Sequence, residues 1–223
     1  MEVFVTPASS AQKRLWFIDR LEPGNCAYHI PIALRLKGAV QPKVILQSVQ
    51  EIVNRHEVLR TTFAFEEGET MQVIHPTHEI ELTEESVDPN SLDTLLKKEA
   101  RKPFDLVKGP LLRIRLLRIS DHELVFVICM HHIVSDGWSM DVLVKEFSEC
   151  YRTFSKAQEP VLPELEIQYA DYAEWQQDEQ IDNTLQNHLD FWKQNLNGPL
   201  SQSELPIDKP RPSVQSFKGS MVR

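Results

Sequence analysis

Two adjacent histidines, His131 and His132, stand at the end of a run of strand-forming residues. Asp136 and Gly137 follow them, and a helix-like segment begins at about Trp138. A strand, a tight turn and a helix start together place an imidazole where it can meet a substrate. Histidine is the side chain most often used as a general base. The arrangement therefore indicates acyl transfer rather than metal or phosphate chemistry.

The two histidines are expected to face opposite ways, because side chains alternate between the two faces of a strand. Opposed neighbours cannot easily chelate one metal ion, and no other spacing of His, Cys, Asp or Glu resembles a metal site. We therefore expect no bound metal. His131 is predicted to pack inward as a structural residue, whereas His132 is predicted to face a cleft and to act in catalysis.

Asp136 and Gly137 have structural and chemical interpretations. Asp136 can cap the following helix at Trp138 or Ser139, or hold an arginine and fix the loop, and we expect such a structural role. A glycine at position 137 suits a turn that needs a positive φ angle or a close approach of substrate. Its N–H would lie near a helix N-terminus, which suits a developing oxyanion. Gly137 is therefore a second candidate catalytic residue.

Helix-like and strand-like segments alternate around this turn. Apolar spacing predicts helices near residues 10–19, 44–54, 90–101 and 138–154, with two more polar helices near 169–180 and 182–196. Ser9 or Ser10 can cap the first of them. Strand-forming runs predict strands near residues 28–36, 59–65, 71–74, 111–119 and 123–130, with hairpins across 66–69 and 120–122. The proline-rich stretch 198–218 is expected to be extended.

Composition and charge exclude several function classes. The formal net charge of −9 over 223 residues argues against nucleic acid and anionic membranes as partners, because both need a basic surface. No apolar run approaches the roughly 18 residues of a membrane span, and the start lacks a secretory signal. The cysteines, Cys26, Cys129 and Cys150, form no CxxC pair and are expected to be reduced, in a cytoplasmic protein.

Four ordered segments carry a resemblance to a known family. They are SSAQKRLW at 9–16, RHEVLRTTF at 55–63, HHIVSDG at 131–137 and YADYAEW at 169–175. They resemble the SxAQxRLW, RHExLRTxF, HHxxxDG and YxDYAxW motifs of nonribosomal peptide synthetase condensation domains. The segment LPIDKPRP at 205–212 also resembles the LPTDRPRP segment of that family. HHxxxDG alone is shared with chloramphenicol acetyltransferase, but the five segments together cover nearly the whole chain.

The resemblance implies an α/β fold of the chloramphenicol acetyltransferase type, an α+β sandwich in which a mixed sheet is flanked by helices. The family domain is about twice as long as this chain, and its later motifs have no counterpart here. We therefore expect residues 1–165 to form the N-terminal lobe. Residues 166–223 are expected to lead into a missing C-terminal lobe, so that the chain is an excised piece or a truncated gene product.

The resemblance also implies amide formation between two thioesters. In the family, an acceptor aminoacyl thioester attacks a donor acyl or peptidyl thioester, and 4′-phosphopantetheine arms of two peptidyl carrier proteins hold them. No cofactor is expected to bind this chain directly. The wording of the second and third motifs most resembles the subtype that joins an L-configured donor to an L-configured acceptor. Arg55 and Arg60 are both candidate partners of Asp136.

Other interpretations of the motifs stay open. An epimerization domain shares HHxxxDG, and so do CoA-dependent acyltransferases, although the other motifs argue against the latter. The chain could also be a non-catalytic lobe that binds carrier proteins or a matching second lobe. We expect the chain alone to be inactive. A lobe built to face another should expose apolar surface, through which the chain could dimerise.

Overall fold

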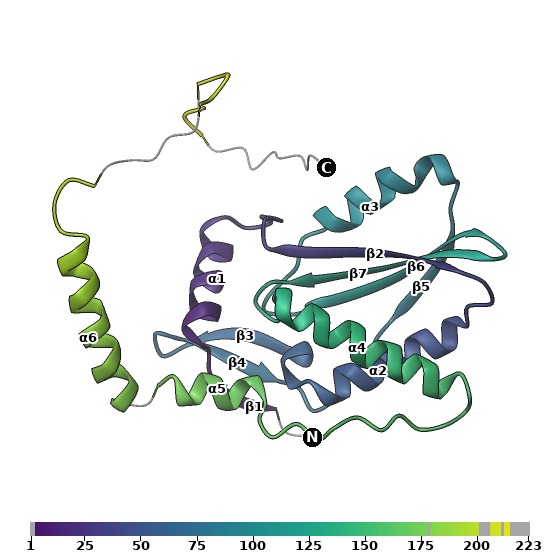
Figure 1. Cartoon of the computed structure of the whole chain (residues 1–223), viewed down its shortest axis with the longest axis horizontal. Helices are drawn as coiled ribbons and strands as arrows, with labels where there is room; N and C mark the ends of the chain where they lie inside the picture. Colours follow the sequence, from purple (N-terminus) through teal and green to yellow (C-terminus); the bar gives the residue numbers. More distant parts are fainter. Residues whose placement is uncertain (1–2, 178, 201–205, 211, 215–223) are drawn as a thin grey trace. The chain divides into compact units, whose positions relative to one another are not determined.

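The computed structural model describes residues 3–177, 179–200, 206–210 and 212–214, and Figure 1 draws the chain. Its contacts divide the chain into two compact units, Met1–Gln176 and Gln177–Arg223. The first unit contains both sheets. The second contains the helix α6 (Glu179–Asn195). In the described part of the chain, no helix is long and apolar enough to cross a membrane.

The larger sheet has four strands in the order β2-β7-β6-β5. Their bounds are β2 (His29–Lys37), β5 (Leu82–Ser86), β6 (Leu112–Ser120) and β7 (Glu123–His131). β7 pairs antiparallel with both β2 and β6, and β5 pairs parallel with β6. The register sets His29 opposite His131, so β7 ends beside the start of β2.

The smaller sheet has three antiparallel strands in the order β1-β4-β3. Their bounds are β1 (Phe4–Pro7), β3 (Thr61–Glu66) and β4 (Glu69–Ile74). The helix α1 (Ser10–Leu21) follows β1 directly. Ser9 and Gln12 form a reciprocal capping box at its N-terminus, which satisfies two backbone N–H groups that the helix cannot satisfy itself.

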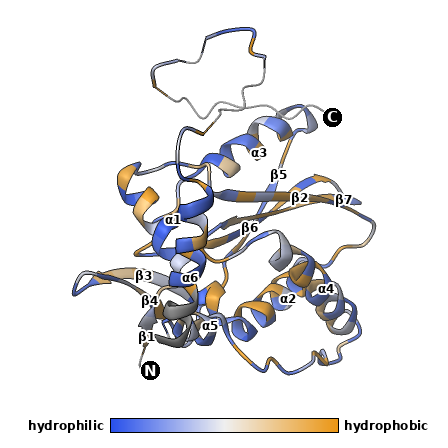
Figure 2. Cartoon of the chain, turned by 60° about the vertical axis from the view of Figure 1, so that its left-hand side comes forward, coloured by the Kyte–Doolittle hydropathy of each residue, from blue (hydrophilic) through white to orange (hydrophobic). Residues whose placement is uncertain are grey.

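Helices cover both faces of the larger sheet. They are α2 (Pro42–Arg55), α3 (Leu92–Arg101) and α4 (Gly137–Phe154), with the short 3₁₀ turns η1 (Glu57–Arg60) and η2 (Pro89–Ser91). α2 and α4 lie together on one face and α3 lies on the other, as Figure 1 shows. Figure 2 shows apolar residues on β2, β6 and β7 and along α2 and α4.

The central strand β7 is buried on both faces. Phe126 and Ile128 belong to the main core, whereas Val125 and Val127 pack with Leu92 of α3. A strand that is covered on both faces has a nearly continuous apolar sequence, and residues 124–130 of β7 have such a sequence. Each fully buried side chain of this kind contributes roughly 1.5–3 kcal/mol. The strand that ends at the two histidines is therefore among the best-anchored parts of the unit.

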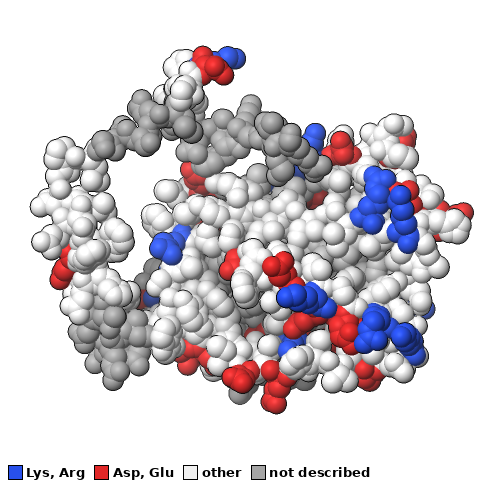
Figure 3. Space-filling view, viewed as in Figure 1, with Lys and Arg blue, Asp and Glu red and all other residues white. Residues whose placement is uncertain are grey.

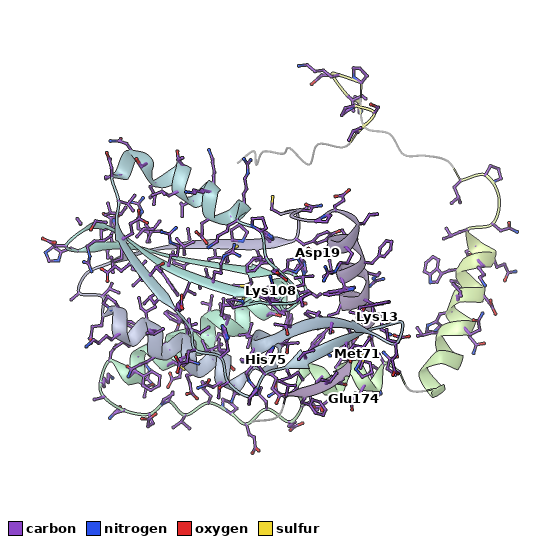
Figure 4. All side chains as sticks on the ribbon, turned by 180° about the vertical axis from the view of Figure 1, so that it is seen from behind. Lys13, Asp19, Met71, His75, Lys108 and Glu174 are labelled. Carbon is purple, nitrogen blue, oxygen red and sulfur yellow. The ribbon has the colours of Figure 1, made fainter. Side chains whose placement is uncertain are left out.

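The short helix α5 (Tyr169–Trp175) belongs to the first unit and packs against β1 and η1. The Thr6 hydroxyl of β1 donates to Glu174 Oε1 at 2.7 Å, and Figure 4 shows Glu174 beside the smaller sheet. Gln168, its N-cap, donates to the Arg55 carbonyl at 3.0 Å and accepts from the Glu57 N–H at 3.1 Å. The compact unit thus runs to Gln176, past the boundary expected after residue 165.

Most predicted elements are present near their expected bounds. Two strands were not predicted. β1 is only four residues long, and β5 reads LTEES with mostly exposed side chains, so neither shows an apolar period. The helix expected to reach residue 180 ends at Trp175. Much of the stretch 198–218, expected to be extended, lies outside the described residues.

Candidate functional site

His131 and His132 face different surroundings, as predicted. His131 is the last residue of β7 and is only 3% exposed. His132 is exposed and lines a cavity of about 500 Å³. Other walls of this cavity come from α1, the start of α4 and the first residue of α5, and include Arg14, Ile18 and Tyr169. The structure therefore brings the exposed imidazole to a space that a substrate group can enter.

The buried His131 shapes the turn that carries His132. Its Nδ1 accepts a hydrogen bond from the Ile133 N–H at 3.1 Å, so the neutral ring holds its proton on Nε2. The rings of His29 and Phe104 lie edge-on to it, each with centroids 6.0 Å away. Burial lowers the pKa of His131 to about 4, with smaller contributions from His29 and His132. This residue is thus a neutral acceptor rather than a proton carrier.

The backbone of the turn is held from β2 and α1. The His132 N–H donates to the Tyr28 carbonyl at 2.8 Å. On the other side, the Gln12 side chain donates to the Ile133 carbonyl at 3.4 Å and to Gln72 Oε1 at 3.0 Å. Both glutamines are 1% exposed. They were not predicted as site residues, although Gln12 belongs to the first motif segment.

Asp136 is the N-cap of α4. Its Oδ1 accepts from the Ser139 N–H at 2.8 Å and from the Ser139 hydroxyl at 2.7 Å. The Ser139 hydroxyl and N–H lower the pKa of this carboxyl below its usual value. The predicted capping role is confirmed, with Ser139 as the capped residue.

Arg55 does not pair with Asp136, so that expectation is wrong. The Arg55 Nε lies 3.0 Å from Glu146 Oε1, and its guanidinium also donates to the Pro163 carbonyl. His56 Nε2 lies 2.6 Å from the other oxygen of Glu146. The reason is placement: Arg55 is the last residue of α2, and its side chain lies beside Glu146 in the middle of α4. These contacts tie α2, α4 and the connector to α5 together.

Arg60 also has other partners, so the second expected pairing with Asp136 is wrong. Its guanidinium donates to the carbonyl of His75, at the end of β4, and lies 3.3 Å from Glu57 Oε1. His75 is labelled in Figure 4. Among the described residues, Asp136 forms no ion pair with an arginine. Its carboxylate is instead used by the start of α4.

Gly137 is the first residue of α4 and does not adopt a positive φ angle, so that part of the prediction is wrong. A Cβ added here would meet no other atom within 4 Å. No protein contact therefore requires glycine at this position. The predicted role of its N–H near a substrate oxyanion stays a prediction.

Tyr169 was not predicted individually, although it opens the fourth motif segment. Its hydroxyl lies 2.9 Å from the Ser9 hydroxyl, and Ser9 is fully buried. Burial raises the pKa of the Tyr169 phenol. The bond between the two hydroxyls fixes α5 against the start of α1, at the wall of the His132 cavity.

The described side chains offer no cluster of metal ligands. Within the described ranges, no group of three or more His, Cys, Asp or Glu side chains is placed to hold a metal ion. On the face drawn in Figure 3, acidic and basic side chains lie interleaved. The His132 cavity combines one imidazole, the start of α4, the Arg14 side chain and apolar residues such as Leu15 and Ile18.

Comparisons with known proteins give the family. The profile of the Condensation domain family matches residues 4–223. A linear gramicidin synthase protein of Brevibacillus parabrevis is 44% identical over 223 residues, which cover 97% of this chain and 4% of that protein. This chain therefore spans only a small part of the curated relatives that it matches.

Two solved structures are similar in fold and sequence. The X-domain from teicoplanin biosynthesis matches with a TM-score of 0.83 and 28% identity, over 93% of this chain and 47% of that one. The four-domain nonribosomal peptide synthetase AB3403, bound to AMP and glycine, matches with a TM-score of 0.80 and 27% identity, over 98% of this chain and 17% of that one. The expected α/β fold class, with sheets flanked by helices, is thereby confirmed. The chain belongs to the condensation domain family.

Proposed function

We propose that this chain supplies the histidine-bearing side of an amide-forming site. In the proposed reaction, the amine of an acceptor aminoacyl thioester attacks the carbonyl carbon of a donor acyl or peptidyl thioester. The observation that carries the proposal is the position of His132, exposed in a cavity of about 500 Å³ beside the N-terminus of α4. Membership of the condensation domain family supports the reaction class.

His132 needs to do only modest proton work in this reaction. A free α-amino group has a pKa near 7.7–8.0, so roughly a tenth is already neutral at pH 7. Reaching the neutral form then costs about 1–1.5 kcal/mol. Holding the amine and the thioester in a near-attack geometry can contribute about 7–11 kcal/mol. We therefore propose that His132 mainly orients the amine and accepts its proton late.

The bond changes balance without an added reactant. The new C–N bond forms as the C–S bond breaks, and the proton lost by the amine is passed by His132 to the sulfur of the released thiol. The first N–H groups of α4, with Gly137 at its start, are proposed to face the oxyanion that develops on the carbonyl oxygen.

The substrates are proposed to arrive on partner proteins. Donor and acceptor peptidyl carrier proteins would present them on 4′-phosphopantetheine arms, and an L-configured donor with an L-configured acceptor is the favoured pair. Because the chain spans about half the length of the X-domain that it matches, we propose that activity also needs the other half of the family fold. The free thiols Cys26, Cys129 and Cys150 suit a reducing compartment such as the cytoplasm.

An amide-forming assay with loaded donor and acceptor carriers tests the proposal. The chain is assayed alone and with the second half of a related condensation domain supplied. We expect product only in the second case, and a loss of about 10²–10⁴-fold for His132→Ala, the typical contribution of a general base. The matched control is His122→Ala, which changes an exposed histidine in the β6–β7 turn. Full activity of His132→Ala would overturn the assignment of His132.

The same assay separates the alternative functions. Exchange of the substrate Cα proton with D₂O, without amide product, would favour the epimerization reaction that shares the HHxxxDG motif. Retention of carrier proteins with neither exchange nor product would favour a non-catalytic binding role.

A further inference from the structure

A second cavity adjoins the His132 cavity. It has a volume of about 220 Å³ and lies between α2, α4 and the connector to α5. The two cavities have five lining residues in common: Val58, Val134, Ser135, Ser139 and Tyr169. A group held in the second cavity would therefore lie next to the space that His132 faces.

The inner wall of the second cavity is apolar and well buried. Ile52 of α2 and Met130 of β7 are each 1% exposed, and Leu59 is 6% exposed. Leu165 and Ile167 line it from the connector to α5. Met130 lines this cavity and not the one that contains His132, so it reports on this cavity alone.

Most polar side chains around the second cavity already have partners. His56 pairs with Glu146, and Gln168 bonds the backbone of Arg55 and Glu57. Three more are hydroxyls with contacts of their own: Ser135 to Met140 Sδ, Ser139 to Asp136, and Tyr169 to Ser9. Among the described lining side chains, only the indole N–H of Trp138, which is 80% exposed, has no such contact, so the cavity offers a carboxylate no cationic partner. Burying an unpaired charge there would be strongly unfavourable.

We propose that this second cavity binds an apolar side chain, aliphatic or aromatic, of a substrate residue whose thioester or amine lies at His132. A cavity of about 150 Å³ lined by apolar residues accepts benzene. A volume of about 220 Å³ thus admits a side chain of the size of leucine or phenylalanine. The inference rests on the proposed function for its substrate, but the cavity can be tested without any reaction.

The second cavity should discriminate between substrate side chains by their size and charge. Filling or emptying one methylene in an apolar pocket is worth about 10–200-fold in discrimination. We therefore expect a phenylalanine residue to bind at least about 10-fold more tightly than an alanine residue. An aspartate residue should bind most weakly, because its carboxylate has no partner in the cavity.

Direct binding to the 223-residue chain tests the proposal. N-acetyl-L-phenylalaninamide, N-acetyl-L-alaninamide and N-acetyl-L-aspartic acid amide are titrated while the methyl signal of Met130 is followed by NMR. The phenylalanine compound is expected to shift this signal in a saturable way, and the other two are not. Equal shifts with the aspartate compound, or no shift with the phenylalanine compound, would overturn the proposal.

Two substitutions on one helix provide a matched comparison. Val142 lines the second cavity from α4, so Val142→Phe should fill it and weaken binding by at least about 10-fold. Val144 lies on the same helix, is 47% exposed and lines neither cavity, so Val144→Phe should bind normally. Leu165→Trp should fill the cavity from the connector, and it replaces Val142→Phe in the comparison if that variant does not fold. Equal binding by the filled and control variants would contradict the proposal.

The outcome is independent of catalysis. Binding, with no amide formed even when the second half of a related condensation domain is supplied, would leave the cavity assigned and remove the proposed reaction. Amide formation without this binding would keep the reaction and remove the cavity from it.

Discussion

At the scale of the residue, the two neighbouring histidines differ because one is buried and the other is not. His131 Nδ1 accepts a hydrogen bond from the Ile133 N–H, and burial lowers the pKa of His131 to about 4, whereas His132 is exposed to the cavity. One imidazole thus fixes the shape of the turn while the other lines the cavity. The two tasks need opposite surroundings, which the structure provides by ending β7 at the buried His131 and placing His132 in the turn that follows.

The low pKa of His131 predicts an acid-sensitive fold. A histidine that titrates near 6.5 when unfolded and near 4 when folded binds its proton first in the unfolded state, so stability falls as the pH falls from 6.5 to 4. The full difference is about 3 kcal/mol. Urea unfolding measures the free energy of unfolding of wild type and His131→Phe across this pH range. The free energy should fall less for the variant, because it lacks the His131 contribution.

His122→Phe is the control for that measurement, because His122 is exposed in a turn. It should keep the wild-type pH dependence. Identical pH dependence in wild type and His131→Phe would contradict the assignment of the acid sensitivity to His131. His29, whose pKa burial also lowers, acts in the same direction and remains in both proteins.

At the scale of the element, the start of α4 is the feature that the site depends on most. Asp136 caps it through Ser139, and the same helix start lines the His132 cavity. The capping contacts are local, within three residues, so the sequence could predict them. The contacts that hold the preceding turn, from Gln12 and Tyr28, come from distant segments and could not be predicted in this way.

Loss of the cap should harm stability more than chemistry. Asp136→Ala removes the acceptor of the Ser139 N–H and is expected to lower the free energy of unfolding by about 0.5–2 kcal/mol. Asp136→Asn keeps an acceptor and should cost less. Thermal and urea unfolding measure both variants. Unchanged stability of Asp136→Ala, with a selective loss of rate in the amide-forming assay, would contradict this structural role.

At the scale of the whole molecule, the first unit leaves apolar side chains exposed. Phe17 and Leu21 of α1 are 65% and 68% exposed, and Phe65 at the end of β3 is 63% exposed. Phe17 and Phe65 line a common apolar hollow. Such a surface favours association in solution.

We expect the chain to self-associate in a concentration-dependent way, measured by sedimentation velocity. Removing one large apolar side chain from the surface, as in Phe65→Ser, should weaken association by roughly 10–100-fold, the equivalent of about 1.5–3 kcal/mol. Val161→Ser, at an 87% exposed residue that does not line the hollow, should have no effect. A chain that stays monomeric at high concentration would rule out this surface as a dimer contact.

The sequence by itself determined the parts of the protein that local patterns encode. The apolar run of β7 and the cap at Asp136 both depend on residues a few positions apart. The motif segments also identified the family. The short strand β1 and the polar edge strand β5 lack an apolar period, and only pairing with β4 and β6 makes them strands.

The tertiary structure alone decided which distant side chains meet. In the fold, Arg55 pairs with Glu146 and Arg60 donates to the His75 carbonyl, and neither pairs with Asp136. Gln12 donates to Gln72 and to the Ile133 carbonyl in the turn. The fold also forms the second cavity from three separate segments. A local pattern sets which face of an element is apolar, but packing sets which element that face meets. Partners far apart in the chain therefore became known only from the fold.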